Sequence, residues 1–177
     1  IHERLVGSEM CIRDRAMNVA IKAAQDKTIV TLGITPTRPD TGFGYIHYDG
    51  AGMVKNVLTF KEKPKLYAAK QMIEQGQHAW NGGMFILQSK TWLNAIQQSN
   101  PKIHKTVLHA WQSKKSDMWF VRLDSELFEQ SPSDSIDYAV MEKAKEIKID
   151  VKLVVLNAGW SDSVSYTHLT LPTTPYV

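Results

Sequence analysis

The sequence predicts an α/β protein with a mostly parallel central sheet. Short apolar runs rich in β-branched residues, such as 28–34 and 151–156, alternate along the chain with amphipathic stretches of helical period. That alternation is typical of sheets built from parallel strands. The composition agrees, since 43% of the residues are hydrophobic and 22% are charged, as in ordinary globular proteins. Ligands of such sheets bind beyond the carboxyl ends of strands, so functional residues are expected there.

Each element of this pattern has its own sequence signal. A helix is expected to end at 19–25, and the segment 35–44 is expected to be a loop because it holds two prolines and two glycines. Pro64 is expected to open a helix that ends at Gln75, before Gly76. Strands are predicted at 28–34, 45–48, 53–61, 83–87 and 151–156. Further helices are predicted at 89–98, capped by Ser89, at 101–113, and at 136–145, capped by Ser135.

Charge and cysteine content exclude several classes of protein. The net charge of +3 comes from 21 basic and 18 acidic residues that are scattered along the chain. The one basic doublet is Lys114-Lys115, so we expect no nucleic-acid partner. No apolar run reaches the ~18 residues of a transmembrane helix, so we expect no membrane partner. The single cysteine excludes a disulfide framework and a cysteine-based zinc site.

The two ends carry related sequences. Codons that encode 9–14, extended by two bases, give the codons for 164–169 when they are reverse-complemented. One oligonucleotide in opposite orientations therefore explains both ends, and it resembles the transposon-end adapter of sequencing libraries; two unrelated natural termini are the alternative. We therefore expect 1–15 and 163–177 to be non-native, adapter-derived segments that do not pack, and 1–15 not to be helical. The natural segment is then 16–162, cut by read length.

Clusters of polar residues and glycines fall at the predicted strand ends and loops. They are 33–46 (Gly-Ile-Thr-Pro-Thr-Arg-Pro-Asp-Thr-Gly-Phe-Gly-Tyr-Ile), 60–64 (Phe-Lys-Glu-Lys-Pro), 80–85 (Trp-Asn-Gly-Gly-Met-Phe), 135–143 (Ser-Ile-Asp-Tyr-Ala-Val-Met-Glu-Lys) and 159–162 (Gly-Trp-Ser-Asp). Their order and spacing resemble the second half of the catalytic domain of the mannose-1-phosphate guanylyltransferases, over essentially all of 16–162. The resemblance implies an incomplete Rossmann-like nucleotidyltransferase domain.

Glu62 and Lys63 are the first candidate site residues. A carboxylate accepts two sugar hydroxyls, and an ammonium is a compact charge for a phosphate. By the resemblance, Glu62 binds the mannose ring, and Lys63 binds the sugar phosphate and is catalytic. Pro64 is expected to hold Lys63 extended. Neighbours on a strand face opposite sides, so both reach one ligand only at the strand tip; a surface ion pair is the alternative.

Gly44 and Asn81 are further candidates for substrate binding. Gly44 would let the backbone approach the sugar, with a hairpin turn as the alternative. Asn81 offers a donor and an acceptor to a sugar hydroxyl, with a backbone contact at the start of a strand as the alternative. The family usually has Asn-Ser-Gly-Met here, and Gly82 replaces that serine. Thr37 and Arg38 are weaker candidates for phosphate or sugar contacts.

Asp162 is the predicted metal ligand and a predicted catalytic residue. By the resemblance, it holds Mg²⁺ together with a second aspartate from a missing upstream half; the alternative is a helix N-cap. Asp137 is expected to brace its helix near the site. Trp92 and Trp111 are expected in the core, and the spacing of the histidines is not that of a metal site.

The resemblance implies an enzyme that transfers GMP from GTP to mannose 1-phosphate, giving GDP-mannose and pyrophosphate in the cytoplasm. The nucleotide-binding loop would lie upstream, so the nucleotide-binding residues are unknown and the 177-residue chain alone is expected to be inactive. One alternative is a sugar-1-phosphate nucleotidyltransferase that uses another base. A second is a non-catalytic regulatory relative that binds sugar nucleotide. Homo-oligomerisation, a fused isomerase domain and a β-helix stay open.

Overall fold

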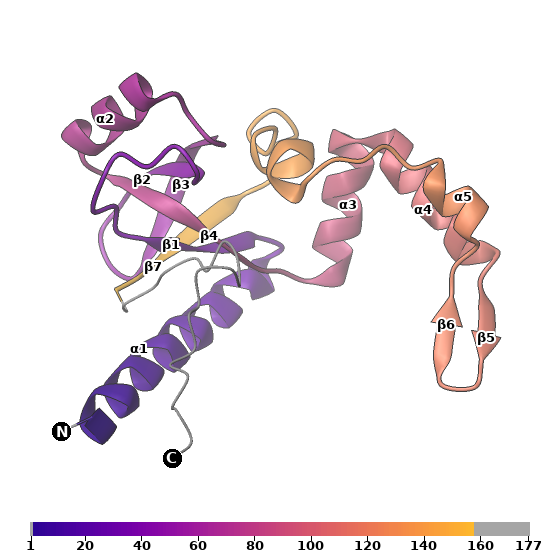
Figure 1. Cartoon of the computed structure of the whole chain (residues 1–177), viewed down its shortest axis with the longest axis horizontal. Coiled ribbons are helices and arrows are strands. Elements are labelled where there is room, and N and C mark those ends of the chain that lie inside the picture. The colour runs from indigo at the N-terminus through magenta and orange to yellow at the C-terminus, as the bar shows by residue number, and fades with distance from the viewer. Residues whose placement is uncertain (1, 158–177) are drawn as a thin grey trace, which may run out of the picture.

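The computed structural model describes residues 2–157, which form two parts (Figure 1). We call the part built around a sheet the body and the projection 89–130 the arm. The strands of the body are β1 (Ile29–Ile34), β2 (Tyr45–Asp49), β3 (Val54–Lys61), β4 (His78–Ile86) and β7 (Val151–Leu156). Its helical segments are α1 (His2–Ala23), η1 (Ala24–Asp26), α2 (Leu66–Gln75) and η2 (Asp137–Met141).

The sheet of the body closes on itself. Its order is β1-β4-β2-β3-β7, and β7 pairs with both β1 and β3. The prediction of an α/β protein is confirmed, but the prediction of a mostly parallel sheet is wrong, because β1–β7 is the one parallel pair among the described strands. The reason lies in the connections. No helix separates β1, β2 and β3 along the chain, and β3 and β4, which α2 does connect, have β2 between them in the sheet.

Apolar side chains pack on both faces of β1 and β7. Every residue of β1 is buried, which explains why its residues are apolar apart from Thr31. Ile29 and Leu153 belong to one cluster of buried side chains, and Val30 and Val154 belong to the other, as the alternation of strand side chains requires. On the second face, α1 and the start of η1 contribute buried alanines spaced four residues apart, namely Ala16, Ala20 and Ala24.

The expectation that 1–15 is not helical is wrong, because α1 begins at His2. The segment contains no proline, so nothing in it interrupts the helix that 16–23 continues. Residues 11–15 are nonetheless exposed, and Ala16 is the first of the following residues to be buried. The turns of α1 before Ala16 that can be described therefore add nothing to the core.

Several element boundaries differ from the predicted ones. β4 begins at His78 rather than at 83, and its buried part is 78–80. Gly82 and Gly83 lie inside the strand, where the β1–β4 register shifts. Ser89 is helical, and Gln88 precedes it without a side-chain cap. Ser135 does cap, because its hydroxyl accepts a 3.5 Å bond from the Tyr138 N–H. The segment that follows is a π-helical turn.

The arm consists of two helices, a hairpin and a short helix. They are α3 (Ser89–Ser99), α4 (Pro101–Gln112), β5 (Lys115–Asp117), β6 (Phe120–Arg122) and α5 (Ser125–Glu129). The hairpin and α5 were not predicted. Trp111 is exposed on α4, so its assignment to the core is wrong, whereas Trp92 packs on the core cluster. Within 2–157, no helix has the length and apolar character needed to cross a membrane.

Candidate functional site

Gly44, Glu62 and Asn81 lie side by side at one edge of the closed sheet. The register of β2 is the reason, because Tyr45 is paired with Lys61 of β3 on one side and with Trp80 of β4 on the other. In the chain, Gly44 precedes Tyr45, Glu62 follows Lys61 and Asn81 follows Trp80. Antiparallel pairing therefore brings together three residues from different sequence clusters.

Gly44 has no room for a side chain. A Cβ atom built on it would overlap Glu62 Oε2 and would lie 3.3 Å from Asn81 Cβ. Its carbonyl accepts a 2.7 Å hydrogen bond from the Asn81 backbone N–H. Gly44 is not among the residues with positive φ, so the hairpin-turn alternative does not explain the glycine. It is needed because the Glu62 carboxylate comes close to the backbone.

Asn81 is held by neighbours on three elements. Its Oδ1 accepts bonds from Thr31 Oγ1 at 3.1 Å and from the Gly83 N–H at 3.3 Å. Its Nδ2 donates to Asp137 Oδ1 at 2.9 Å. The second N–H of the amide has no acceptor among the described residues, so it can serve a further one. Asp137 thus braces Asn81 from η2, close to the place that the sequence suggested.

Glu62 is a carboxylate withdrawn from water. Its side chain is 10% exposed, and its backbone N–H donates a 3.0 Å bond to Glu142 Oε1. Glu62 Oε2 is buried and has no hydrogen-bond partner among the described residues. Burial raises the pKa of Glu62, and the negative charge of Asp137 raises it further, while Lys63 acts in the opposite direction. A surface ion pair does not describe a carboxylate in this position.

Lys63 leaves the strand in a left-handed conformation. Its φ of 41° contradicts the expectation that Pro64 holds it extended, although the proline still disfavours the right-handed helical region. β3 ends at Lys61, so the alternation of strand side chains no longer applies to the next two residues. The Lys63 ammonium lies 3.9 Å from Glu62 Oε1 and is largely exposed. Both groups can therefore contact one ligand at the strand tip, which is the one place where neighbouring residues of a strand can do so.

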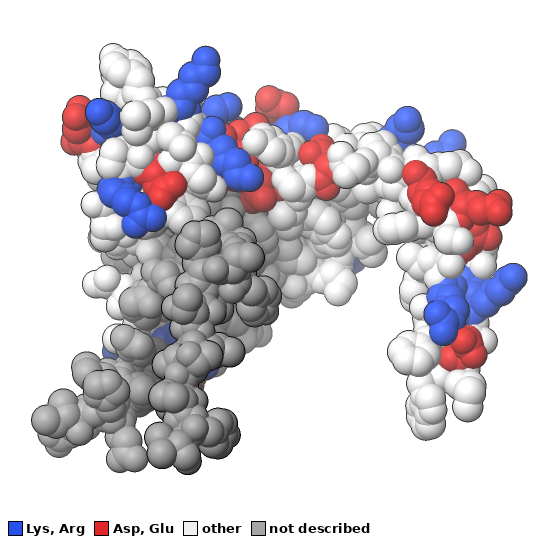
Figure 2. All heavy atoms as spheres, in the orientation of Figure 1, with Lys and Arg blue, Asp and Glu red and all other residues white. Residues whose placement is uncertain are grey.

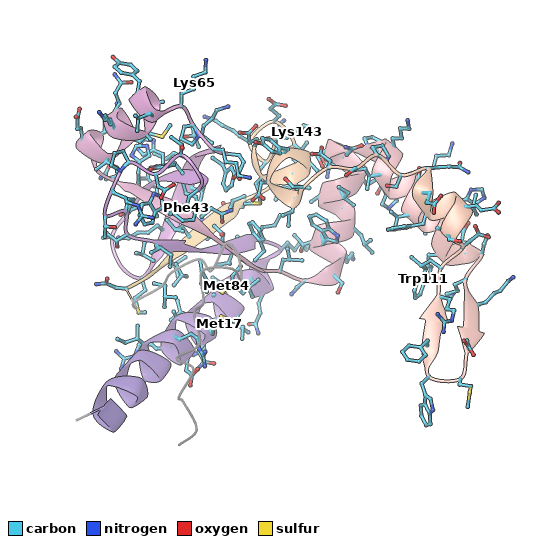
Figure 3. All side chains as sticks on the ribbon, in the orientation of Figure 1. Met17, Phe43, Lys65, Met84, Trp111 and Lys143 are labelled. Carbon is cyan, nitrogen blue, oxygen red and sulfur yellow. The ribbon has the colours of Figure 1, made fainter. Side chains whose placement is uncertain are left out.

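Two further carboxylates surround this pair. Burial raises the pKa of Asp137, while its hydrogen bonds and the Lys63 charge lower it. Glu142 accepts from the Glu62 backbone and also lies 3.5 Å from the Lys61 ammonium. The cluster therefore combines hydroxyl acceptors with an exposed cation. Figure 3 shows Lys65 and Lys143, from the segments that follow Glu62 and Glu142, on the side of the body that carries α2 and η2.

The indole of Trp80 carries a buried N–H group that its sequence did not indicate. Its Nε1 is buried without a hydrogen-bond partner within the described part of the chain. The Phe43 ring lies 5.0 Å away, and the Arg38 guanidinium lies 5.6 Å from the indole. Its position next to Asn81 in the sequence was the available signal.

Arg38 is paired with Asp40 at 2.7 Å, and the Gly42 N–H and Arg38 together lower the pKa of Asp40.

The predicted metal ligand, Asp162, lies outside the described residues. Over 2–157, no three histidine, cysteine, aspartate or glutamate side chains gather closely enough to hold a metal ion. His47 and His78 stack with ring centroids 4.6 Å apart but form only a pair. The described residues by themselves therefore do not fit a metal site.

Comparison with known proteins gives consistent matches. The profile of the family described as Nucleotidyl transferase matches residues 4–164. The xanthan biosynthesis protein XanB of Xanthomonas campestris pv. campestris is 41% identical over 92% of this chain and 35% of its own length. A mannose-1-phosphate guanylyltransferase of Salmonella montevideo is 38% identical over 85% of this chain and 32% of its own.

Solved structures resemble the chain as well. The crystal structure titled mannose-6-phosphate isomerase from Helicobacter pylori superimposes with a TM-score of 0.77 and 31% identity, covering 87% of this chain and 60% of that one. The chain spans about a third of the length of the curated relatives that it matches.

Proposed function

Because the chain belongs to the nucleotidyl transferase family, we propose that it is part of an enzyme that transfers GMP from GTP to mannose 1-phosphate, giving GDP-mannose and pyrophosphate. Relatives named mannose-1-phosphate guanylyltransferase, at 34–38% identity, support the choice of substrates. They are about three times as long as the matched segment, so the activity is proposed for the longer parent protein.

The observation that carries the sugar-binding proposal is Glu62 Oε2, which has no hydrogen-bond partner within residues 2–157. A buried acceptor without a donor is costly, and a sugar hydroxyl would satisfy it. Gly44 supports this role, because any side chain there would displace the carboxylate. Asn81 would offer its free N–H to the same ring while Asp137 holds its amide in place.

Lys63 would bind the sugar phosphate. Its ammonium is exposed, lies next to Glu62 and has no closer carboxylate among the described residues. In the proposed reaction, an oxygen of the sugar phosphate attacks the α-phosphorus of GTP in line, and pyrophosphate leaves without a covalent enzyme intermediate. The chain's residues would contribute by holding the attacking phosphate in position and by reducing repulsion between the two phosphate groups.

Mg²⁺ is part of the proposal through Asp162. This aspartate would hold the ion together with an aspartate of the parent protein that lies upstream of the matched segment. When bound, the ion would supply charge stabilisation for the phosphate oxygens. The partners would be GTP and mannose 1-phosphate, and a cytoplasmic location would suit these substrates.

Steady-state kinetics of the full-length parent protein test the roles of Glu62 and Lys63. Lys63→Ala removes a charge-assisted contact of roughly 1.5–3 kcal/mol, so kcat/KM for mannose 1-phosphate should fall about ten- to hundredfold. Glu62→Gln should weaken recognition of the sugar hydroxyls and leave the fold intact. Lys65→Ala, two residues from Lys63, is the matched control and should behave as wild type. Unchanged kinetics for Lys63→Ala and Glu62→Gln would remove both residues from the site.

The same assay separates the alternatives. Release of pyrophosphate with GTP but not with other nucleoside triphosphates supports the guanylyltransferase, and a preference for another base supports a related nucleotidyltransferase. Binding of GDP-mannose without any turnover supports a regulatory relative. The 177-residue chain alone should release no pyrophosphate, because it lacks the upstream half of the site.

A further inference from the structure

The hairpin of the arm exposes apolar side chains at its tip. Met118 and Trp119 are 92% and 90% exposed, and Phe120 is 63% exposed. Figure 2 shows the free end of the arm without charge, whereas charged side chains lie above it. Contiguous apolar surface of this kind is rare on monomeric proteins unless it forms an interface.

The residue types at the hairpin tip are also unusual for a turn. Short hairpin loops favour Asn and Gly, because these residues tolerate positive φ. Here Met118 adopts a φ of 47°, and Trp119 follows it. A long side chain in this conformation is an uncommon choice for a turn. The residues at the tip are therefore better explained by contact with something else than by the turn itself.

The same arm contains an apolar cavity next to the base of the hairpin. Its volume is about 470 Å³, and most of its lining side chains are apolar. Trp111, near the end of α4, and Leu123, directly after β6, form the wall nearest to the hairpin. Cavities of this size hold small organic ligands, so an indole ring fits.

From these features we propose that the arm is a self-complementary interface, in which the hairpin tip of one chain enters the arm cavity of a second copy. Each hairpin strand is three residues long, which is roughly 10 Å. Two hairpins packed antiparallel about a twofold axis therefore bring each tip to the base of the other. Such a contact is isologous and closes as a dimer.

The available surface is sufficient for this dimer. Trp119 and Phe120 together expose on the order of 350 Å², given the ~150–250 Å² of an aromatic side chain. Met118, Val121 and the exposed cavity residues Leu93, Leu108 and Trp111 bring the apolar area toward the roughly 800 Å² per partner of a stable interface. The proposal does not depend on the enzymatic activity proposed above.

Sedimentation equilibrium of the 177-residue chain tests the dimer. The wild-type chain should associate to a dimer, and the double variant Met118→Ser/Trp119→Ser should raise the dissociation constant at least about 30-fold, the effect of losing an interface hot spot. Both replaced side chains are almost fully exposed, so the fold should survive, which circular dichroism verifies. Tyr67→Ser, which removes an exposed aromatic from α2, is the matched control and should dimerise as wild type.

A mixing experiment tests the contact itself. Leu108→Glu places a charge in the cavity wall and should also prevent dimerisation. An equimolar mixture of this variant with the tip variant regains one intact tip and one intact cavity, so it should associate more tightly than either variant alone. A monomeric wild-type chain, an unchanged dissociation constant for the tip variant, or a mixture no tighter than its components would each overturn the proposal. A parent protein that is monomeric at the same concentrations would overturn it as well.

Discussion

The body and the arm treat polar and apolar side chains in opposite ways. In the body, Glu62 and Asp137 are carboxylates withdrawn from water, and Glu62 Oε2 lacks a partner among the described residues. In the arm, Met118 and Trp119 are apolar side chains held in water. Neither arrangement favours folding. The difference teaches that each region carries groups that do not stabilise the fold, which is consistent with the sugar-binding role proposed for the body and the interface role proposed for the arm.

The largest expected effect is a loss of stability in the body, which is tested by replacing one leucine in each region. Leu153 is fully buried in the body, so Leu153→Ala should lower the free energy of unfolding by about 2–5 kcal/mol. Leu93 is exposed on the arm, so Leu93→Ala should lower it by less than about 1 kcal/mol. Urea unfolding measures both. Equal losses would show that the arm is packed as tightly as the body, against the comparison.

Comparing Gly44 with Gly42 tests whether the candidate site requires a glycine at position 44. Gly44→Ala forces Glu62 to move and should lower the free energy of unfolding by about 1–3 kcal/mol, the usual range for overpacking. In the parent enzyme it should also weaken mannose 1-phosphate binding. Gly42→Ala is the control, since the one described atom near its added Cβ is Asp40 Oδ1, on an exposed loop. If both variants unfold alike, the contact with Glu62 does not require the glycine.

The pH dependence of stability tests the burial of Glu62. Its pKa in the folded state is raised above 4.5, so the native protein loses stability as the pH rises through that raised value. Glu62→Gln removes this loss and should unfold at a higher temperature than wild type at pH 8, by roughly 2–4 °C for each kcal/mol gained. The advantage should shrink below pH 4.5. Glu129→Gln on the arm is the control, and an equal gain in that variant would contradict a special role for Glu62.

The smallest expected effect concerns the ends. Removal of 1–15 and 163–177 should change the free energy of unfolding by no more than about 0.5 kcal/mol, the range of surface changes. Residues 11–15 are exposed, which supports this expectation for part of the segment. Thermal unfolding of the trimmed and complete chains measures the difference. A loss of several kcal/mol would show that the ends are real structure.

The sequence was informative where a local rule decides the structure. The β-branched run of β1, the stop at Gly76 and the cap at Ser135 were predicted because each depends on residues close in the chain. The same holds for the loop before β2. The direction of pairing in the sheet was predicted wrongly, because it depends on which strands become neighbours in space.

The candidate site was predicted as separate residues rather than as an arrangement. Glu62 and Lys63 were identified through the family resemblance that the ordered clusters carry, but the left-handed turn at Lys63 has no local signal. That Asp137 holds Asn81 depends on a hydrogen bond between η2 and β4, which are distant parts of the chain. Trp80 was missed because its burial, rather than its type, makes its indole N–H notable.

The closed sheet has two short seams, the β2–β4 pairing beside the candidate site and the β3–β7 pairing away from it. β3 pairs with β7 at three positions, whereas β1 pairs with β7 at six. A short ladder opens more readily than a long one, so the amide hydrogens of 54–56 should exchange with solvent before those of β1. The far end of β3, where Lys61 pairs with Tyr45, does not share this seam. Opening of the β3–β7 seam therefore leaves Gly44 and Glu62 next to each other, because β2 and β3 pair at five positions.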